Sequence, residues 1–253
     1  MKKILDFGGA VLELEGTSLF ENGRQMTPSV RKVSDMTGVL LTRNFITERN
    51  RDDVLYYMYR GAAGSEDDRF KSNSIRYDIT IIKKYALGNE LNKTVGHYHP
   101  IAEAGLSYPE LYEVVEGNAL FIFQKKWGSR YLVDLIHAES GEKVLVMPNY
   151  GHITVNEGSG DLVLANLTND SFRSDYAGIK EMHGGAVFAL SDGSIMLNKT
   201  YRNISLNARD EYAMPVQLGC RSNMYECFVE DPSKFDFLNR PTLLELMQEQ
   251  KVI

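Results

Sequence analysis

Cysteine is scarce in this sequence, which contains only Cys220 and Cys227 among 253 residues. Two cysteines are too few for a disulfide scaffold, so we expect both to be reduced thiols packed near the C-terminal part of the chain. A convincing signal peptide is missing as well, because Asp6 and Glu13 interrupt the first apolar stretch. No run of about 18 apolar residues occurs, so we expect no membrane-spanning helix. These absences predict a cytoplasmic protein without a membrane partner.

The sequence also has no excess of positive charge. Its formal net charge is −6, which argues against a nucleic-acid partner because such a partner requires a basic surface. A small anionic substrate needs only a local cluster of donors and stays compatible with this charge. The apolar fraction of 43% is typical of a soluble protein that buries a core. Since no linker rich in Pro, Gly or Ser and no repeat is found, we expect residues 1–253 to form one domain.

A helical pattern is missing between the strands predicted from residue 54 onward. Short β-branched and aromatic segments follow one another at roughly ten-residue spacing, separated by turn residues. Parallel strands would need long helical crossovers, so the pattern predicts an all-β fold, an antiparallel sandwich or barrel of the jelly-roll type. The predicted strands are 54–60, 75–85, 93–99, 111–117, 119–125, 131–138, 143–148, 152–156 and 162–168.

The flanking segments have a different character. We expect residues 1–53 to form a helical or irregular extension, with one or two short helices within 25–53, and residues 54–190 to form the core. Within the core, 174–190 reads as a short helix or turn followed by a strand. Residues 191–253 form a C-terminal extension, whose last segment, 239–253, has Pro241 early in a helical pattern of leucines. Short helical additions are therefore expected at both ends of the β core.

Three histidines and one glutamate carry the chemistry of the core. His97 and His99 are two residues apart, so on a strand they point to the same face of the sheet. Glu110 opens the next strand, and His152 follows a proline-containing segment. If these segments are neighbours, three imidazoles and one carboxylate converge inside the barrel. Such a donor set suits one divalent transition metal that acts as a Lewis acid.

Two glutamates compete for the role of the carboxylate ligand. The common spacing His-x-His-x3-Glu selects Glu103, whereas Glu110 satisfies the pattern Glu-x6-Gly that ends at Gly117. The segment between them contains Pro100 and Pro109 and is predicted to be a loop. A glutamate at a strand start is held more firmly than one in a loop, so we favour Glu110.

The segments TVGHYHP, ELYEVVEGNALFIFQ, VLVMPNYGHITVN and SDYAGIKEMHGG resemble the cupin-type glucose-6-phosphate isomerases of archaea and some bacteria. The resemblance covers about residues 54–190. It implies a cupin fold, a homodimer, and a metal held by His97, His99, Glu110 and His152, with Fe²⁺ favoured and Zn²⁺, Mn²⁺ and Ni²⁺ as alternatives. The expected activity is the interconversion of glucose 6-phosphate and fructose 6-phosphate in glycolysis and gluconeogenesis.

The resemblance also implies the residues that bind and convert a sugar phosphate. The phosphate contacts are Thr80, Thr94, Gly96 and Tyr176. Glu110 and Tyr112 are the implied catalytic pair, for a proton transfer between C1 and C2; a metal-assisted hydride shift would use the same ligands without a base. A non-catalytic sugar-phosphate-binding cupin and a dioxygenase with three histidines and one glutamate are the alternative functions.

Two departures from the family pattern concern the pocket rim. About four residues are inserted at 100–109, and the segment before His152 reads Asn149-Tyr150-Gly151 where an aromatic wall is expected. Further residues have smaller roles in this interpretation. His137 is expected on the surface, His183 and Lys180 could approach the phosphate, and Tyr59 and Arg60 close the strand 54–60.

Overall fold

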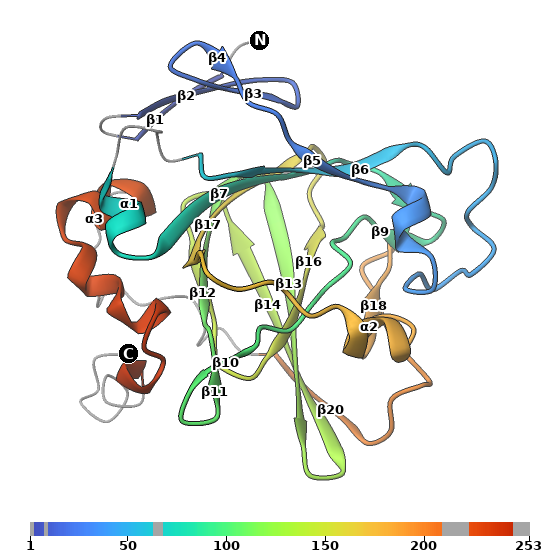
Figure 1. Ribbon diagram of the computed structural model, residues 1–253. Coiled ribbons are helices and arrows are strands. Elements are labelled where there is room, and N and C mark those ends of the chain that lie inside the picture. The colour runs from blue at the N-terminus through green and yellow to red at the C-terminus, as the bar shows by residue number, and fades with distance from the viewer. Residues whose placement is uncertain (1–2, 8–9, 63–67, 209–222, 245–253) are drawn as a thin grey trace.

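Two facing β-sheets dominate the computed structural model, which describes residues 3–7, 10–62, 68–208 and 223–244 (Figure 1). The larger sheet has six strands in the order β15-β12-β17-β7-β6-β5, and the smaller has four in the order β16-β13-β14-β20. The strands of the two sheets are β5 (Ser29–Lys32), β6 (Val54–Arg60), β7 (Ile75–Ile82), β12 (Glu110–Glu116), β13 (Asn118–Trp127), β14 (Arg130–Glu139), β15 (Lys143–Val146), β16 (Gly151–Asn156), β17 (Leu162–Asn169) and β20 (Ile204–Ala208). This arrangement confirms the predicted double-sheet jelly roll of the cupin type.

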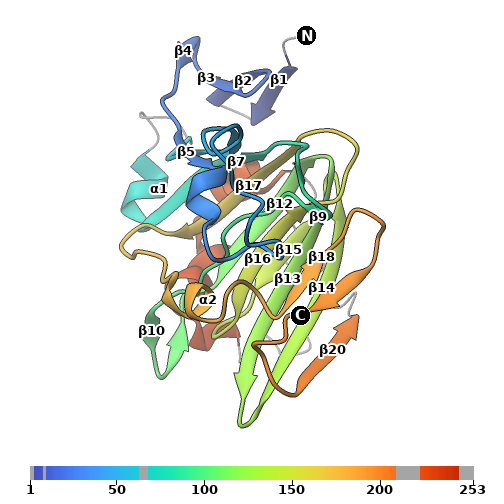
Figure 2. The ribbon, with the colours of Figure 1, turned by 90° about the vertical axis from the view of Figure 1, so that its right-hand side faces the viewer.

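The core lies between the sheets because successive side chains of a strand point to opposite faces. On β13, Phe121 and Phe123 belong to the inner cluster, together with Val114 of the facing sheet. Leu120 and Ile122 of the same strand point outward and pack under the segment that contains β18 (Val187–Ala189). Figure 2 shows β18 beside β13 and β14, and β20 at the edge of the smaller sheet. The alternation that predicted β13 therefore also explains why this strand is buried on both faces.

Two details of the predicted sheet are wrong. Residues 93–99 do not form a regular strand; they make only isolated antiparallel bridges, such as the one between His97 and His152. Gly96 adopts a φ of 80°, which interrupts the extended backbone inside this segment. In addition, β20, which is not among the nine predicted strands, pairs with β14 in parallel, whereas the sandwich was expected to be antiparallel. Because β20 lies far along the chain from β14, its direction cannot be read from local pattern.

The first thirty residues are mostly strand, where helical or irregular structure was expected. Four strands form a separate antiparallel sheet at the top of Figure 1: β1 (Lys3–Phe7), β2 (Ala10–Glu15), β3 (Ser18–Glu21) and β4 (Arg24–Gln25). In β2, Leu12 and Leu14 are buried and alternate with glutamates, which is the period of a half-buried strand. The 3₁₀ helix η1 (Val33–Met36) is the only helix of the described residues in 1–53.

Small elements complete the described chain. Three short antiparallel strand pairs lie outside the two main sheets: β8 (Ala86–Leu87) with β9 (Glu90–Leu91), β10 (Ile101–Glu103) with β11 (Leu106–Ser107), and β18 with β19 (Ile195–Leu197). The helices are α1 (Asp68–Ser72), α2 (Ala177–Glu181), α3 (Met224–Glu230) and η3 (Pro232–Leu238). The helix α2 and the strand β18 match the helix and strand expected within 174–190. None of the helices in the described residues has the length and apolar character that crossing a membrane requires.

The C-terminal predictions are borne out in part. Residues 242–244 are helical, residues 239–241 are not, and residues 245–253 of the predicted helix lie outside the described residues. Cys227 is buried in the larger core cluster and is disulfide-bonded, so the expectation of a reduced thiol is wrong for this residue. Cys220 lies outside the described residues.

Candidate metal centre and substrate pocket

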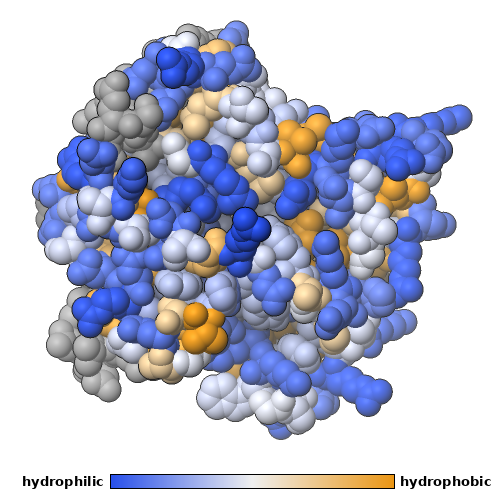
Figure 3. Space-filling view, viewed as in Figure 1, coloured by the Kyte–Doolittle hydropathy of each residue, from blue (hydrophilic) through white to orange (hydrophobic). Residues whose placement is uncertain are grey.

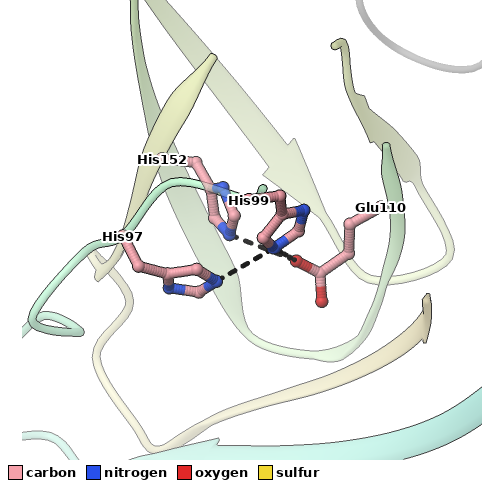
Figure 4. A group of neighbouring side chains, drawn as sticks. All are labelled: His97, His99, Glu110 and His152. Atoms are coloured by element: carbon pink, nitrogen blue, oxygen red, sulfur yellow. Dashed lines mark hydrogen bonds and ion pairs between the residues drawn. The ribbon is translucent and has the colours of Figure 1, made fainter. Parts of the chain in front are cut away.

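Four side chains converge between the two sheets, as Figure 4 shows: His97, His99, Glu110 and His152. One ligand atom from each lies within 4.8 Å of the others. The Nε2 atoms of His97 and His99 are 3.1 Å apart, and Oε2 of Glu110 is 3.2 Å from Nε2 of His152. His99, Glu110 and His152 are each less than a tenth exposed. The structure therefore brings together all four residues that the sequence singled out as metal ligands.

These ligands come from both sheets. The backbones of His97 and His152 exchange two hydrogen bonds, of 3.2 and 3.0 Å, so their side chains stand side by side. Glu110 begins β12 in the facing sheet, where it pairs with Thr168 of β17. The sequence predicts convergence inside the barrel if the three segments are neighbours. The side chains do converge, and the carboxylate reaches the imidazoles across the sandwich because β12 and β16 belong to different sheets.

The donor set fits a divalent metal. The outer nitrogen of His99, Nδ1, lies 2.9 Å from the carbonyl oxygen of Tyr108 and donates to it, so Nε2 offers a lone pair to the cluster. Oε1 of Glu110 accepts a hydrogen bond of 2.7 Å from Nδ2 of Asn166. Oε2 of Glu110 is buried without a hydrogen-bond partner. A bound cation would satisfy this oxygen and the three inward-facing nitrogens together.

The charge state of the cluster favours a cation. Burial lowers the pKa of His97 well below its usual value and also lowers that of His152, so these imidazoles are neutral at pH 7. Burial raises the pKa of the Glu110 carboxyl, but the contacts with His152 and His99 outweigh it and hold the pKa well below its usual value. Neutral imidazoles and an ionised carboxylate are the forms that ligate metals.

Glu103, the competing ligand, lies elsewhere. It ends β10 in the hairpin with β11, whose turn residues Ala104 and Gly105 both have positive φ. Oε1 of Glu103 accepts a hydrogen bond of 2.6 Å from Oγ1 of Thr242. The inserted loop therefore contacts the C-terminal extension. The choice of Glu110 over Glu103 agrees with this geometry.

A cavity of about 580 Å³ opens beside the cluster. Its floor is one face of the larger sheet, where alternate residues of neighbouring strands form rows. One row runs from Tyr112 through Asn166 and Asp78 to Arg60. The cavity is lined by Arg31, Met58, Arg60, Arg76, Asp78, Thr80, His97, His99, Glu110, Tyr112, Asn166, Thr168, Asp170, Ser171, Phe172, Arg173, Ser174 and Tyr176. Figure 3 shows strongly hydrophilic side chains gathered over the region of β7 and β17.

The four residues implied as phosphate contacts also come together. Thr80, Thr94, Gly96 and Tyr176 line a smaller cavity of about 60 Å³, and Thr80 and Tyr176 line the large cavity as well. A Cβ atom at position 96 would lie 2.3 Å from Cγ1 of Ile153, so this close approach of the backbone requires glycine. We call these four residues the cradle. They are all uncharged, so the cradle by itself provides no positive charge for an anion.

Arg31 supplies positive charge next to the cradle, and sequence reasoning missed it. Its guanidinium carbon lies 5.9 Å from the centroid of the Tyr176 ring. Burial lowers the pKa of Arg31, but Tyr56 and Tyr176 raise it more, so its pKa stays above the usual value and the side chain stays charged. The hydroxyl of Tyr56 accepts a hydrogen bond of 3.3 Å from the backbone N–H of Val95, within the segment that carries the cradle.

The side chain between the two ligand histidines anchors their segment on its other side. The hydroxyl of Tyr98 accepts a hydrogen bond of 2.8 Å from Nε2 of Gln124, which is fully buried. Gly151 leaves room for the Tyr98 ring, because a Cβ atom there would lie 2.4 Å from it. The unusual segment before His152 is therefore explained by packing on Tyr98. At the pocket rim, Tyr108 of the inserted loop stacks on Phe172 with ring centroids 4.9 Å apart.

Several other residues considered at the sequence level lie apart from the site. Tyr59 is buried in the core and donates to the carbonyl of Thr17 at 2.6 Å. His137 is exposed and pairs with Glu157 at 2.9 Å, as expected for a surface residue. His183 and Lys180 line neither of the two cavities, so the structure does not support their expected approach to the phosphate. Arg60 does line the large cavity.

Comparison with known proteins identifies the family. A profile described as "Glucose-6-phosphate isomerase (GPI)" matches residues 30–205. The chain is 26% identical over 191 residues to "Glucose-6-phosphate isomerase" of Thermococcus litoralis, which covers 75% of this chain and 92% of the relative. It is 28% identical over 174 residues to the protein of the same name from Thermococcus onnurineus, covering 68% and 84%, and 25% identical over 181 residues to that of Pyrococcus furiosus, covering 71% and 88%. The chain belongs to the glucose-6-phosphate isomerase family.

Proposed function

We propose that this protein is a metal-dependent isomerase that interconverts glucose 6-phosphate and fructose 6-phosphate. The observation that carries the proposal is the position of the ligand cluster of His97, His99, Glu110 and His152. It lies at the side of a cavity of about 580 Å³ that also contains residues of the cradle. A sugar phosphate held by the cradle would place its remote carbon atoms at the cluster. Relatives that carry this enzyme name cover most of the chain.

The metal of this proposal is a divalent transition ion, with Fe²⁺ favoured and Zn²⁺, Mn²⁺ and Ni²⁺ as alternatives. His97, His99 and His152 would hold it through Nε2, and Glu110 through Oε2. Bound there, such an ion polarises the carbonyl and hydroxyl oxygens of a substrate and stabilises negative charge on them. Asn166 keeps the Glu110 carboxylate in place through its hydrogen bond to Oε1.

The phosphate group would bind at the cradle. The hydroxyls of Thr80, Thr94 and Tyr176 and the backbone next to Gly96 provide hydrogen bonds, and Arg31 provides the positive charge. Hydrogen bonds between charged partners are roughly twice as strong as those between neutral groups. Because the phosphate is remote from the reacting carbons, these contacts serve to orient C1 and C2 at the cluster.

Proton transfer would be the task of Glu110 and Tyr112. Aldose–ketose interconversion moves one proton between C2 and C1 of the substrate, and the ionised Glu110 carboxylate is in the correct form to accept it. Burial and the nearby Glu110 hold the pKa of the Tyr112 hydroxyl well above its usual value. Tyr112 therefore keeps its proton at neutral pH and donates to a substrate oxygen. Its hydroxyl lies 3.4 Å from Nε2 of His152, at the edge of the cluster.

The alternative functions fit the pocket less well. A cupin dioxygenase usually takes apolar or aromatic substrates, whereas this cavity has Asp78, Asn166 and several arginines in its lining. A non-catalytic sugar-phosphate-binding protein would not need a complete set of ligands with an ionised carboxylate. We further propose that the enzyme acts as a homodimer in the cytoplasm, in glycolysis or gluconeogenesis.

The test of the phosphate site is a steady-state assay of fructose 6-phosphate conversion by Arg31→Met. Loss of one hydrogen bond to a charged group costs about 1.5–3 kcal/mol, so we expect kcat/KM to fall about ten- to a hundred-fold. Arg130→Met, which removes an exposed arginine that lines neither cavity, is the matched control and should leave kcat/KM unchanged. Unchanged kcat/KM in Arg31→Met would place the phosphate elsewhere.

A further inference from the structure

Three more arginines line the large cavity, and a hexose monophosphate does not account for them. Arg60 ends β6 and Arg76 lies in β7, while Arg173 belongs to the loop between β17 and α2. We call them the distal arginines. They differ from Arg31 in position: Arg31 lies over the Tyr176 ring of the cradle, whereas Arg60 and Arg76 lie beside Asp78.

Arg60 and Arg76 lie at the opposite end of the cavity floor from Thr80, and Arg173 follows Phe172, whose ring centroid is 4.5 Å from that of His99. On β7, Arg76 is four residues from Thr80, and strands rise about 3.3 Å per residue, so the two backbones are roughly 13 Å apart. Arg76 instead shares a row with the ligand cluster, because it pairs with Thr168, which pairs with Glu110. A ligand whose phosphate occupies the cradle and whose reacting carbons meet the cluster therefore extends towards the distal arginines.

One buried carboxylate, that of Asp78, forms ion pairs with two of these arginines. Nε of Arg76 lies 2.9 Å from both oxygens of Asp78, and Nη1 of Arg60 lies 3.9 Å from Oδ2. Asp78 is only 6% exposed and also accepts a hydrogen bond from the backbone of Gly61. Arg60, Arg76 and Asp78 together therefore carry one positive charge in excess. No described residue accepts a hydrogen bond from Nη1 or Nη2 of Arg76, so these groups are free for a ligand.

Arg173 adds a second positive charge without an ion-pair partner among the described residues. Asp170, in the same loop, also lines the cavity. Asp175 is nearer to Arg173 in the sequence, but it is not part of the cavity lining, and its Oδ1 accepts a hydrogen bond from the backbone of Ala177. Counting the distal arginines against Asp78 and Asp170 leaves an excess of one positive charge at this end. Guanidinium groups bind phosphate and carboxylate in a bidentate manner, which makes arginine well suited to an anionic ligand.

We propose that Arg60, Arg76 and Arg173 bind a second anionic group, so that the cavity accepts a sugar phosphate with another phosphate or a carboxylate at its opposite end. This inference rests on the proposed function, which places the first phosphate in the cradle. A ketose phosphorylated at both ends cannot isomerise, because its C1 oxygen is esterified. Bound in this cavity, it would act as a competitive inhibitor of the proposed reaction.

The test is isothermal titration calorimetry of the metal-loaded protein with three ligands that do not react. Fructose 1,6-bisphosphate carries a second phosphate, 6-phosphogluconate carries a carboxylate, and 1,5-anhydroglucitol 6-phosphate carries no second anion. We expect at least one doubly anionic ligand to bind about tenfold or more tightly than the anhydroglucitol, as one added charge-assisted contact implies. Because the C1 carboxylate of 6-phosphogluconate also reaches the ligand cluster, the gain is assigned to the distal arginines only where their variants lose it.

Variants separate the distal arginines from the metal and the cradle. Arg173→Met and Arg60→Met should each reduce the preference for the doubly anionic ligand several-fold, whereas Arg130→Met should not change it. The ion pairs of Asp78 are with Arg60 and Arg76, so Arg173→Met removes charge without breaking either of them. Thermal unfolding of each variant checks that it is folded.

The outcomes distinguish the two proposals. If the anhydroglucitol fails to bind, the cradle and the proposed function are in error. If it binds but neither doubly anionic ligand binds more tightly, the distal arginines serve only to neutralise Asp78, and the present inference is overturned. An equal loss of affinity for all three ligands in Arg173→Met would overturn it as well.

Discussion

Replacing Gly96 with alanine tests whether the backbone of the cradle depends on glycine. Gly96 has a φ of 80°, and the left-handed conformation costs an L-residue about 1–2 kcal/mol. The new Cβ atom would also lie 2.3 Å from Cγ1 of Ile153 and 3.2 Å from the carbonyl oxygen of His152. Overpacking of this kind costs about 1–3 kcal/mol. Gly96→Ala should therefore lower the free energy of unfolding by about 2–5 kcal/mol.

Gly105→Ala is a matched control for this prediction. Its φ of 78° is nearly the same, but no atom lies within 4 Å of the added Cβ. This variant should lose only the conformational part, about 1–2 kcal/mol. Urea unfolding of both variants measures the difference in the free energy of unfolding. The double variant Gly96→Ala/Ile153→Ala removes the clash with Ile153, which neighbours the ligand His152. It should therefore retain more metal than Gly96→Ala alone.

Equal destabilisation by the two alanine variants would refute the reasoning, because it would show that Ile153 does not press against position 96. Metal content, measured by elemental analysis, gives a second readout. Gly96 precedes the ligand His97, so a displaced backbone should reduce metal retention in Gly96→Ala and leave it unchanged in Gly105→Ala.

Four further variants and an isotope experiment probe the site itself. Asn166→Leu leaves Oε1 of Glu110 without its donor and should weaken metal binding about 10–100-fold in a competition titration with a chelator; unchanged affinity would exclude a positioning role. Glu103→Gln should retain full metal content, and loss of the metal would return Glu103 to the ligand set. Thr94→Ala should reduce kcat/KM about ten- to a hundred-fold while metal content is kept, whereas Thr94→Ser should retain most activity because it keeps the hydroxyl. Glucose 6-phosphate deuterated at C2 should lose deuterium to water during conversion if Glu110 transfers a proton, and complete retention in the product would indicate a hydride shift instead.

The ligand cluster could be predicted from the sequence because the signals for it are short-range spacings and turn residues. The spacing of His97 and His99 gives a common face at once, even though their segment makes only isolated bridges. Glu110 could be chosen over Glu103 because prolines mark the loop between the histidines and the strand. The strands of the core were recognised by the same local alternation. The position of Glu110 in the facing sheet was not predicted, since sheet order depends on long-range pairing.

The arginines of the pocket could not be found in this way. Arg31 lies in a segment with an irregular pattern, and it reaches the cradle only because β5 pairs with β6 at the edge of the larger sheet. Asn166 is one polar residue within the otherwise apolar stretch 162–167 of β17, and its partner lies 56 positions away in the sequence. Such a polar interruption of a buried strand is a usable signal, since an unpaired amide there would be costly.

The measurement that tests the central claim most directly is the rate of fructose 6-phosphate isomerisation against metal occupancy. The protein would be stripped with a chelator and reloaded stepwise with Fe²⁺, Zn²⁺, Mn²⁺ or Ni²⁺, with metal content determined for each sample. We expect activity to disappear in the metal-free protein and to rise in proportion to occupancy up to about one ion per chain, while His152→Ala neither retains metal nor regains activity. Full activity in the metal-free protein, or a fully loaded protein that does not convert fructose 6-phosphate, would contradict the account.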